Sequence, residues 1–185
     1  MFYRVVIALL VLLSLSSCGG GTGVSAGALG LSSTQDPGPI DPTTLPTSGQ
    51  ASYLGFLSLN LPQLNGERAT YTGALGLAVD FGRASGQLTG SAEGFRSGGT
   101  ELQGRVFVTE GTLERDADVA IDYTFEAGLS GTLSGGGLQN SVLTGTMTGD
   151  FSGEGAATVS GVAFGNVTTA TGVDVFDGSF AAAEN

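Results

Sequence analysis

Several residue types that carry particular chemistry are absent from this chain of 185 residues. It has no histidine, no lysine and no tryptophan, and Cys18 is its single cysteine. Histidine and lysine are the usual bases that activate a serine nucleophile, and histidine and cysteine are the usual zinc ligands. We therefore expect no catalytic residue, no zinc site, no bound cofactor and no intramolecular disulfide. The composition favours a protein that is not an enzyme.

Basic residues are also scarce. Six arginines face 17 acidic residues, and the net charge is −11. Nucleic acids and anionic lipid headgroups are recognised by clusters of basic side chains. A chain this acidic excludes nucleic acid as a partner.

The first 17 residues have the layout of a secretory signal. Arg4 is followed by an apolar run from Val5 to Leu13 and then by small residues up to Ser17. A run of this length is too short for a transmembrane helix, which needs about 20 residues. We predict a signal peptide over residues 1–17, whose removal takes Arg4 away and changes the net charge from −11 to −12.

The residues at the predicted cleavage site resemble the lipobox of bacterial lipoproteins. Leu15-Ser16-Ser17-Cys18 is followed by Gly19. The resemblance implies cleavage between Ser17 and Cys18, a diacylglycerol on the Cys18 sulfur and an acyl chain on its amine, which together attach the chain to a membrane. Because an aspartate does not follow the cysteine, the resemblance points to the outer membrane, with periplasmic and surface exposure both open. The alternative is an ordinary cleavage site beside a chance cysteine.

Residues 18–50 differ in composition from the rest. They are Gly, Ser, Thr and Pro with few large apolar side chains, and four of the five prolines lie between Pro37 and Pro46. Such a composition buries too little surface to offset its ordering entropy. We predict a flexible tether over residues 18–50.

Residues 51–185 alternate between apolar and polar side chains in short segments separated by turn residues. Glycine and threonine replace the usual helix formers, which indicates an all-β fold. The clearest segment is Thr70–Phe81, in which Tyr71, Leu75, Leu77, Val79 and Phe81 share one face. The other predicted strands are Tyr53–Leu59, Gly86–Ala92, Glu101–Thr109, Asp118–Glu126, Leu129–Ser134, Ser141–Phe151, Ala156–Phe164 and Val173–Phe180.

The boundary between two of these nine segments, near Glu126 to Gly128, is weak, so the strand count is eight or nine, with eight favoured. Eight strands joined by hairpins predict a small antiparallel up-and-down β-barrel, monomeric and without exposed sheet edges. The chain has 33 glycines. Glycines at regular spacing within strands predict bends at barrel corners and aromatic rings lying over bare backbone.

Several short motifs resemble the barrel domain of transferrin-binding protein B and related surface lipoproteins. They occur in the expected order and cover most of the chain from Ala51 to Ala183. The motifs are Ala69-Thr70-Tyr71-Thr72-Gly73, Val79-Asp80-Phe81-Gly82, Gly86-Gln87-Leu88-Thr89-Gly90, Leu143 to Phe151, Gly155 to Gly161 and Val175 to Ala182.

The resemblance implies an eight-stranded barrel on a lipid tether, displayed at the cell surface and binding a host protein, haem or another solute. The chain departs from the family in having room for one barrel and no handle domain. The Phe-Tyr pair of the family's Gly-Phe-Tyr-Gly element is reduced to Asp150-Phe151. Fold, anchoring and a general binding role therefore carry over, and transferrin binding does not.

Other binding chemistry has few candidate residues. In the mature chain, the candidate haem ligands are Tyr53, Tyr71, Tyr123 and Met147. Tyrosines within strand patterns are, however, typical of a barrel wall. Asp116, Asp118 and Asp122 cluster, but the glycine and terminal glutamate of a calcium loop are missing. We interpret them as a solvated turn leading into a strand. No spacing selects a pair of carboxylates for glycoside hydrolysis.

Two functions remain open. The first is a lipid-anchored binding module that displays the predicted loops Glu93–Thr100, Glu110–Ala117 and Gly165–Gly172 to a protein or solute. The second is a structural or interaction lipoprotein of the envelope with no dedicated ligand. A barrel that spans the outer membrane is disfavoured, because the predicted outer faces carry Thr, Ser, Gln and Asp instead of an apolar band.

Overall fold

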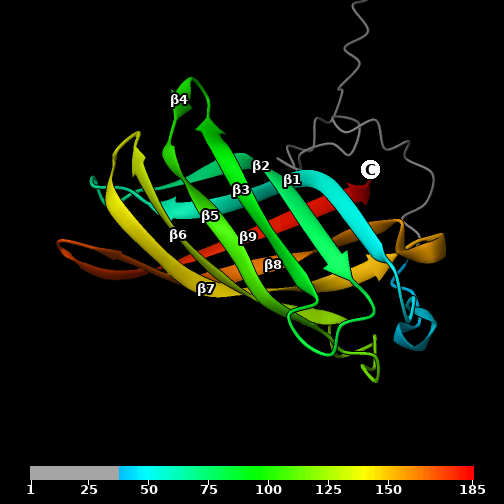
Figure 1. Cartoon of the computed structure of the whole chain (residues 1–185). Helices are drawn as coiled ribbons and strands as arrows, with labels where there is room; N and C mark the ends of the chain where they lie inside the picture. Colours follow the sequence, from blue (N-terminus) through cyan, green and yellow to red (C-terminus); the bar gives the residue numbers. More distant parts are fainter. Residues whose placement is uncertain (1–37) are drawn as a thin grey trace, which may run out of the picture. The chain divides into compact units, whose positions relative to one another are not determined.

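The computed structural model of the chain describes residues 38–185, which form an all-β barrel (Figure 1). The predicted fold class is confirmed. The predicted signal peptide over 1–17, Cys18, and the part of the predicted tether up to residue 37 lie outside the described residues. The strands are β1 (Gln50–Pro62), β2 (Arg68–Asp80), β3 (Leu88–Ser97), β4 (Thr100–Glu101), β5 (Gln103–Leu113), β6 (Phe125–Gly135), β7 (Leu138–Ser152), β8 (Thr158–Thr169) and β9 (Gly172–Glu184).

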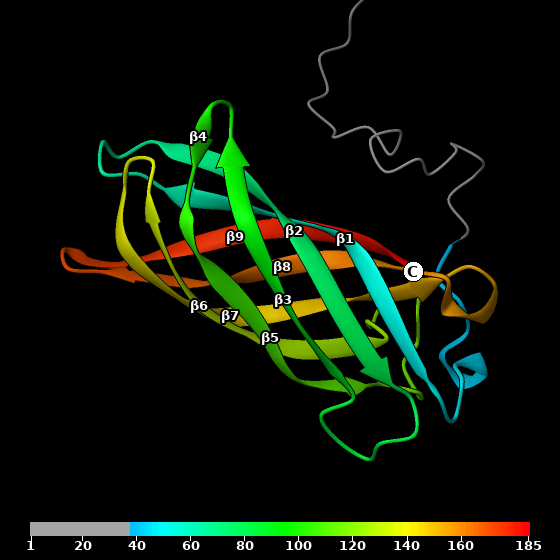
Figure 2. The ribbon, with the colours of Figure 1, turned by 45° about the horizontal axis from the view of Figure 1, so that its top comes forward.

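Eight of these strands close into a ring. Their order is β2-β1-β9-β8-β7-β6-β5-β3, and β2 also pairs with β3. All pairings are antiparallel, and β1 meets β9, so the first and last strands lie side by side (Figure 2). The two-residue strand β4 extends the hairpin between β3 and β5. Closure pairs every long strand on both sides and leaves no exposed sheet edge among them.

The alternating sequence pattern places the apolar residues inside the barrel. On β2, the predicted face of Tyr71, Leu75, Leu77 and Val79 is buried, and Phe81 directly after it is buried too. Many of the largest side chains are fully buried: Tyr53, Phe95, Phe125, Phe151, Leu57, Leu59, Leu61, Leu75, Leu88, Leu129 and Leu133. A side chain with no accessible surface touches no space large enough for a water molecule. The lumen around these residues is therefore a packed core.

Two rows of glycines explain how large rings fit against the wall. Phe180 on β9 lies opposite Gly161 on β8, which lies opposite Gly149 on β7. A Cβ atom on Gly149 would lie 2.7 Å from the Phe180 ring. Four residues along, a Cβ atom on Gly145 would lie 2.8 Å from the ring of Phe176. The bare backbone makes room for each ring, as the glycine spacing predicts.

One predicted strand is wrong. Residues 118–124 of the predicted strand Asp118–Glu126 form turns, and β6 begins at Phe125 and includes the predicted strand Leu129–Ser134. The backbone N–H groups of Ile121 and Asp122 donate to the Asp118 carbonyl, at 2.9 and 2.7 Å. Local hydrogen bonds around an aspartate thus compete with the strand ladder. The expected count of eight barrel strands stands.

The predicted display loops are shorter than expected. Most of Glu93–Thr100 belongs to β3, which continues to Ser97, and Glu110 to Leu113 belong to β5. In Gly165–Gly172 only residues 170–171 lie outside β8 and β9. Each segment has a strand partner, and cross-strand pairing outweighs the low strand propensity of glycine and glutamate.

The last part of the predicted tether packs against the barrel. Pro39 forms an isolated bridge with Ser152, and the Ile40 N–H donates to the Phe151 carbonyl at 3.0 Å. A 3-10 helix, η2 (Pro42–Thr44), follows; a second one, η3 (Glu154–Ala156), lies between β7 and β8. Leu45 is 2% exposed and belongs to the core. This segment is ordered by apolar contacts with the barrel, which its composition alone does not predict.

The helix η2 is capped by Asp41. The Asp41 carboxylate accepts hydrogen bonds from the hydroxyl and the backbone N–H of Thr43, at 2.7 and 3.0 Å. These bonds hold the pKa of Asp41 below its usual value. Within residues 38–185, no helix has the length and apolar character needed to span a membrane.

Candidate functional site

The two ends of the barrel are built from connections of different length. At the short-turn end lie residues 63–67, the β3–β4–β5 hairpin tip, and the tight turns at 136–137 and 170–171. At the long-loop end lie residues 81–87, 114–124 and 153–157, together with the segment before β1. Loops that leave a rigid scaffold commonly carry binding sites. The long-loop end therefore offers the larger loop surface.

Aromatic side chains fill the barrel beneath the long-loop end. The Phe151 ring lies 5.9 Å from Tyr53, 6.0 Å from Phe81 and 5.7 Å from Phe125, between ring centroids. The Phe180 ring lies 5.8 Å from that of Phe125. The rings are tilted by 57–58°, within the range that aromatic pairs favour. This cluster closes the lumen at that end.

Tyr53 ties the aromatic cluster to the loop between β7 and β8. Its hydroxyl donates to the Ala156 carbonyl at 2.8 Å. Burial raises the pKa of Tyr53 to about 12, and the nearby Glu184 carboxylate adds to the shift. The hydroxyl therefore stays protonated and keeps its hydrogen bond at neutral pH.

The loop over residues 114–124 is held at its base. The Glu114 N–H donates to the Thr124 carbonyl at 2.8 Å. The Thr124 N–H donates to the Asp150 carboxylate at 3.0 Å, and the Thr124 hydroxyl donates to the Gly149 carbonyl at 3.2 Å. The same hydroxyl accepts from the Phe151 N–H at 3.2 Å. Thr124 thus links the loop to β7.

Arg115 joins this loop to the segment before β1. Its guanidinium group donates to the carbonyls of Leu45 at 2.9 Å, Pro46 at 2.6 Å and Phe81 at 3.2 Å. All three acceptors are backbone carbonyls, and within residues 38–185 Arg115 forms no ion pair with an acidic side chain. The loop is fixed at both sides of its base.

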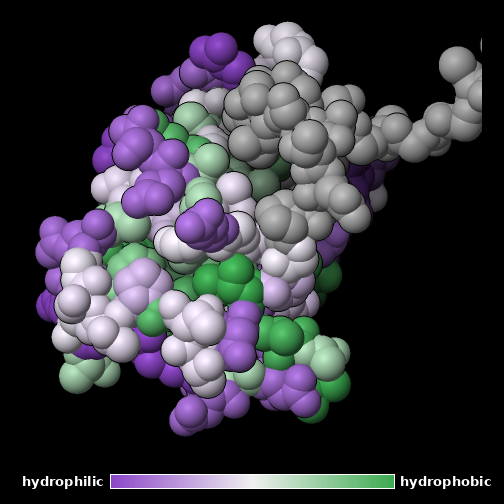
Figure 3. All heavy atoms as spheres, turned by 90° about the vertical axis from the view of Figure 1, so that its right-hand side faces the viewer, coloured by the Kyte–Doolittle hydropathy of each residue, from purple (hydrophilic) through white to green (hydrophobic). Residues whose placement is uncertain are grey.

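Beneath this loop lies a cavity of about 590 Å³. Its wall includes the carboxylates of Glu114, Asp116, Asp122 and Glu126, together with Tyr123. None of these four carboxylates forms an ion pair within residues 38–185, where the pairs use Arg68, Arg96 and Arg105. Figure 3 looks onto the long-loop end, where small groups of hydrophobic residues lie among hydrophilic ones.

Thr148 also lines this cavity. It lies opposite Glu126 in the β6–β7 register and is 7% exposed. Its hydroxyl oxygen is buried and has no hydrogen-bond partner within the described part of the chain. Buried hydroxyls are nearly always hydrogen-bonded, so this one is an exception that calls for an explanation.

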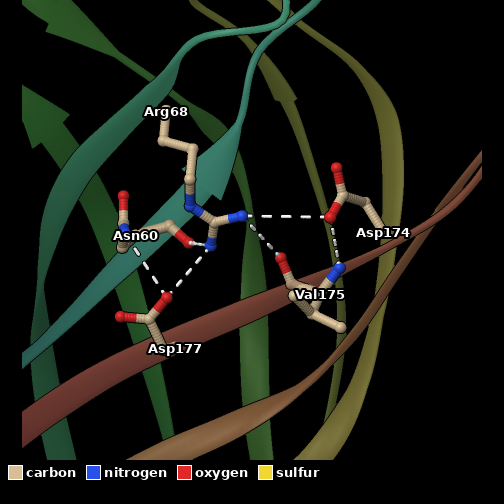
Figure 4. Close-up of polar contacts among 5 residues, drawn as sticks. All are labelled: Asn60, Arg68, Asp174, Val175 and Asp177. Atoms are coloured by element: carbon tan, nitrogen blue, oxygen red, sulfur yellow. Dashed lines mark hydrogen bonds and ion pairs between the residues drawn. The ribbon is translucent and has the colours of Figure 1, made fainter.

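The short-turn end differs in its electrostatics. The Arg68 guanidinium lies 3.0 Å from the Asp177 carboxylate and 3.9 Å from that of Asp174 (Figure 4). It also donates to the carbonyls of Asn60 at 2.7 Å and Val175 at 3.1 Å. One arginine thus compensates two carboxylates and joins β2 to β9 across the end of β1.

A second cavity, of about 440 Å³, lies among the turns at the short-turn end. Pro62, Gln63, Ser141, Thr171 and Asp174 are among its lining residues. The Gln63 amide nitrogen is buried and has no hydrogen-bond partner among the described residues, and the Gln63 side-chain oxygen accepts a long contact of 3.5 Å from the Tyr71 hydroxyl. Asp174 brings the only carboxylate among the lining residues, and Arg68 lies beside it.

Three of the four haem-ligand candidates lie in the core. Tyr53 and Met147 have no exposed surface, and Tyr71 is 2% exposed with its hydroxyl donating to the Gly136 carbonyl at 2.7 Å. Tyr123 is 45% exposed and lines the long-loop cavity. The three core residues have the barrel-wall role that strand tyrosines typically have.

The aspartate cluster occupies a turn, as predicted, although no strand starts at Asp118. Asp116 and Asp122 line the cavity, whereas the Asp118 carboxylate accepts from the Ala120 N–H at 3.1 Å. Within residues 38–185, no three acidic side chains come together closely enough to hold a metal ion. The carboxylates surround a space instead of converging on a point.

Sequence reasoning did not single out Thr148, Glu126 or Arg115. Thr148 and Glu126 belong to different strands, and only the β6–β7 register brings them together. Arg115 reaches residues about 70 positions earlier in the chain. No local pattern marks such long-range partners.

No family model matches this chain, and no curated protein matches it either. Among solved structures, the chain is similar to a mutant of the vaccine antigen transferrin binding protein B from Haemophilus parasuis Hp5. The TM-score is 0.48 and the identity is 17%, over 79% of this chain and 28% of that one. The chain therefore spans about a quarter of that protein's length. Similarity at this level does not establish the family.

Proposed function

We propose that this protein is a lipid-anchored envelope protein whose barrel binds a partner protein on its outer surface. In this proposal residues 1–17 are removed as a signal peptide and Cys18 carries the lipid. The residues from Gly19 to about residue 38 act as a tether. The barrel is then a rigid support held beside a membrane.

The packed lumen is the observation that supports surface binding. Proteins that carry small solutes hold them in cavities of about 300–1,000 Å³. Here the space inside the barrel is taken by side chains such as Phe125, Phe151 and Leu129, which are buried to within 2%. A solute such as haem finds little room in such a lumen. The two cavities of about 590 and 440 Å³ lie at the two barrel ends, where a protein would meet them.

The lipobox-like sequence supports the anchor. Each buried acyl CH₂ group contributes about 0.8 kcal/mol, and lasting attachment needs more than one chain. A triacylated Cys18 meets that condition. Gly19 after the cysteine supports an outer-membrane location.

The anchor is tested by growing cells with an alkyne analogue of palmitate and labelling the protein afterwards. We expect wild-type protein to be labelled and recovered with membranes, and the Cys18→Ala variant to be unlabelled. Ser25→Ala is the control, because it changes the predicted tether close to the thiol and leaves the predicted signal peptide and Cys18 intact. Equal labelling of wild type and Cys18→Ala would contradict the anchor.

Partner binding is tested by site-specific photo-crosslinking in intact cells. A photoreactive residue is placed at Ile121, which is 79% exposed at the long-loop end, or at Leu64, which is 61% exposed at the short-turn end. We expect a discrete adduct with one protein from at least one position, identified by mass spectrometry. The absence of adducts at both would favour an envelope lipoprotein without a dedicated ligand.

Haem binding is tested separately by titration of the purified full chain. We expect the Soret band of haem to remain that of free haem. A shifted band that Tyr123→Phe abolishes would replace the protein partner by haem.

A further inference from the structure

We propose that the outer wall formed by β7, β8 and β9 lies against a neutral lipid surface, so that the barrel rests on its side. The proposal rests on the proposed function, because it names the face that a lipid-anchored barrel turns towards its membrane. It is carried by three features: exposed apolar side chains on this wall, a central strand without charge, and the limited length of chain between the barrel and Cys18.

Large apolar side chains gather on the outside of β7, β8 and β9. They are Val142, Val162, Phe164, Val173 and Val175, and they are between 38% and 67% exposed. Val162 and Phe164 share the outer face of β8, and Val175 lies diagonally across from Phe164 on β9. The remaining two valines lie on either side of Thr168, one on β7 and one on β9. Exposed apolar patches mark sites that meet another protein or a membrane.

The central strand of this wall carries no charge. Thr158–Thr169 contains no acidic and no basic residue, and the outward side chains beside the apolar ones belong to serine, asparagine and threonine. On β9, Asp174 and Asp177 are compensated by Arg68. Moving an unpaired charge out of water is costly, whereas hydroxyl and amide groups can hydrogen-bond to lipid headgroups. The centre of the wall can therefore approach lipid at a small cost in hydration.

The opposite wall is charged. β3 lies opposite β8 in the ring of strands, and β5 is the neighbour of β3. The exposed residues of β3 and β5 include Glu93, Arg96, Arg105 and Glu110. Phe107 on β5 is 47% exposed, and the Arg105 guanidinium lies over its ring, 6.0 Å from the centroid. The barrel thus has one side that suits lipid and one that suits water.

The shape of the β7–β9 wall favours lipid over a second copy of the chain. The outside of a closed barrel is convex, so two such walls would meet along a narrow strip, whereas stable interfaces bury about 800 Å² on each partner. Phe164 is the one aromatic residue among the exposed large side chains of these three strands, although protein interfaces are rich in aromatics. Lipid headgroups are fluid and follow a convex surface. They must be neutral, because a chain with a net charge of −11 is repelled by anionic headgroups.

The chain between the barrel and the proposed lipid keeps this wall near the membrane. Pro39 bridges to Ser152 at the end of β7, so the described chain begins beside the wall. About 20 residues separate Pro39 from Cys18, and they span at most about 70 Å. β7, with 15 residues, is about 50 Å long. A lipid on Cys18 would therefore hold the wall near a bilayer at a high effective concentration, so a patch of modest area suffices.

The proposal is tested by tryptophan fluorescence, because the chain has no tryptophan of its own. The purified full-length lipoprotein is reconstituted into vesicles of phosphatidylcholine, either unmodified or brominated near the top of the acyl chains. Phe164→Trp places a fluorophore on the β7–β9 wall. Phe107→Trp places one on the opposite wall at a matched exposure, 47% against 49% for Phe164. Bromine quenches tryptophan only at close contact.

The two reporters are expected to differ. Brominated lipid should reduce the emission of Phe164→Trp by about twofold or more, and that of Phe107→Trp by less than about a tenth, because only the first lies at the lipid surface. Equal quenching at both positions would mean that lipid surrounds the barrel. No quenching at either would mean that the barrel stands clear of the bilayer. Either result would overturn the proposal.

A charge on the wall tests whether the apolar patch holds the barrel down. Val162→Trp is the reporter in this test, and Phe164→Glu is added on the same strand. We expect the added carboxylate to remove most of the quenching by brominated lipid, because it must stay in water. Phe107→Glu, combined with the same reporter, is the control and is expected to leave the quenching unchanged. Strong quenching in both combinations would contradict the role of the patch.

Two other occupants of the wall would give different results. A dimer in mild detergent, detected by sedimentation and split by Phe164→Glu but not by Phe107→Glu, would assign the wall to a second copy of the chain. A photoreactive residue at position 164 that crosslinks to a protein in intact cells, and not to lipid, would assign it to a partner protein. Each of these results would overturn docking on lipid.

Failure of this proposal is distinguishable from failure of the proposed function. Labelling of Cys18 together with unquenched Phe164→Trp leaves the anchor standing and overturns only the contact with lipid. Absence of labelling at Cys18 overturns the anchor itself. The crosslinks from Ile121 and Leu64, at the two barrel ends, report on the partner protein separately.

Discussion

The two ends of this barrel treat their carboxylates differently. At the short-turn end, Arg68 lies within 4 Å of Asp174 and Asp177 and compensates both. At the long-loop end, Glu114, Asp116, Asp122 and Glu126 line a cavity, and no arginine within residues 38–185 pairs with any of them. A protein that only needed a stable barrel would gain from pairing both sets. The contrast teaches that one end is built for stability, while the other keeps charge available.

The ends also differ in how the lumen is closed. Five aromatic rings, those of Tyr53, Phe81, Phe125, Phe151 and Phe180, fill the barrel under the long-loop end. Leucines such as Leu61, Leu133 and Leu138 are buried towards the short-turn end, together with Tyr71. Of these five rings, Phe125 is the one that also lines the charged cavity. The following changes test this comparison, from the largest expected effect to the smallest.

Truncating Phe151, the ring at the centre of the aromatic cluster, should have the largest effect on stability. Phe151 has no exposed surface and contacts three other rings, so Phe151→Ala is expected to lower the free energy of unfolding by about 3–5 kcal/mol. Urea unfolding followed by circular dichroism measures it. Leu133→Ala, near the other end, is the matched truncation. A larger loss in Leu133→Ala would reverse the assignment of the main packing to the aromatic cluster.

High pH should loosen the aromatic end through Tyr53. Its pKa is about 12 in the folded barrel against 10.0 for an unperturbed tyrosine. Because the folded pKa is raised, the contribution to stability is complete below pH 10. It is lost as the pH rises from 10 to 12, where the unfolded chain ionises more readily.

The Tyr53→Phe variant isolates the contribution of the Tyr53 hydroxyl to stability. At pH 7 the variant is expected to lose about 1–3 kcal/mol, because the Ala156 carbonyl loses its donor. Between pH 10 and 12 its stability should fall less steeply than that of wild type. Parallel curves for the two proteins, from unfolding midpoints at each pH, would contradict the role of Tyr53.

Removing the cation at the short-turn end should make that end resemble the other. Arg68→Met leaves Asp174 and Asp177 uncompensated and is expected to cost about 0.5–1 kcal/mol at low salt, since the group is partly exposed. The loss should shrink as salt is added. Arg83→Met is the control, because no side-chain hydrogen bond or ion pair of Arg83 is found among the described residues. Equal losses in both variants would show that the Arg68 contacts add nothing.

The smallest effects should have opposite signs at the two ends. Asp122→Asn removes one of the unpaired charges around the cavity and is expected to raise stability by a few tenths of a kcal/mol at low salt. Asp177→Asn removes a paired charge and is expected to lower stability by a similar amount. Thermal unfolding at low and high salt measures both. A stabilising Asp177→Asn would remove the electrostatic contrast between the ends.

Much of the fold follows from the sequence because strand alternation is local. Tyr71, Leu75, Leu77 and Val79 alternate with small and polar residues, and all four point into the lumen. The regular spacing of the glycines at 145, 149, 161 and 165 is also visible in the sequence, and two phenylalanine rings occupy the room that these glycines leave.

The predictions fail where partners are far apart in the chain. Asp118–Glu126 alternates like a strand, but hydrogen bonds to Asp118 and Thr124 turn most of it into a loop. Residues 39–49 have the composition of a linker, yet Leu45 is buried and Arg115 binds its carbonyl. A residue's neighbours across a barrel are not encoded within a short window of sequence.

The sequence by itself determined the strand-rich class, the exclusion of histidine, lysine and disulfide chemistry, and the expectation of a lipid on Cys18. Those conclusions need only residue types and local order. Only the tertiary structure decided that the lumen is packed and that the Thr148 hydroxyl lies buried beside Glu126. Burial and charge compensation depend on strand register and ring closure, which bring together residues that lie far apart in the chain.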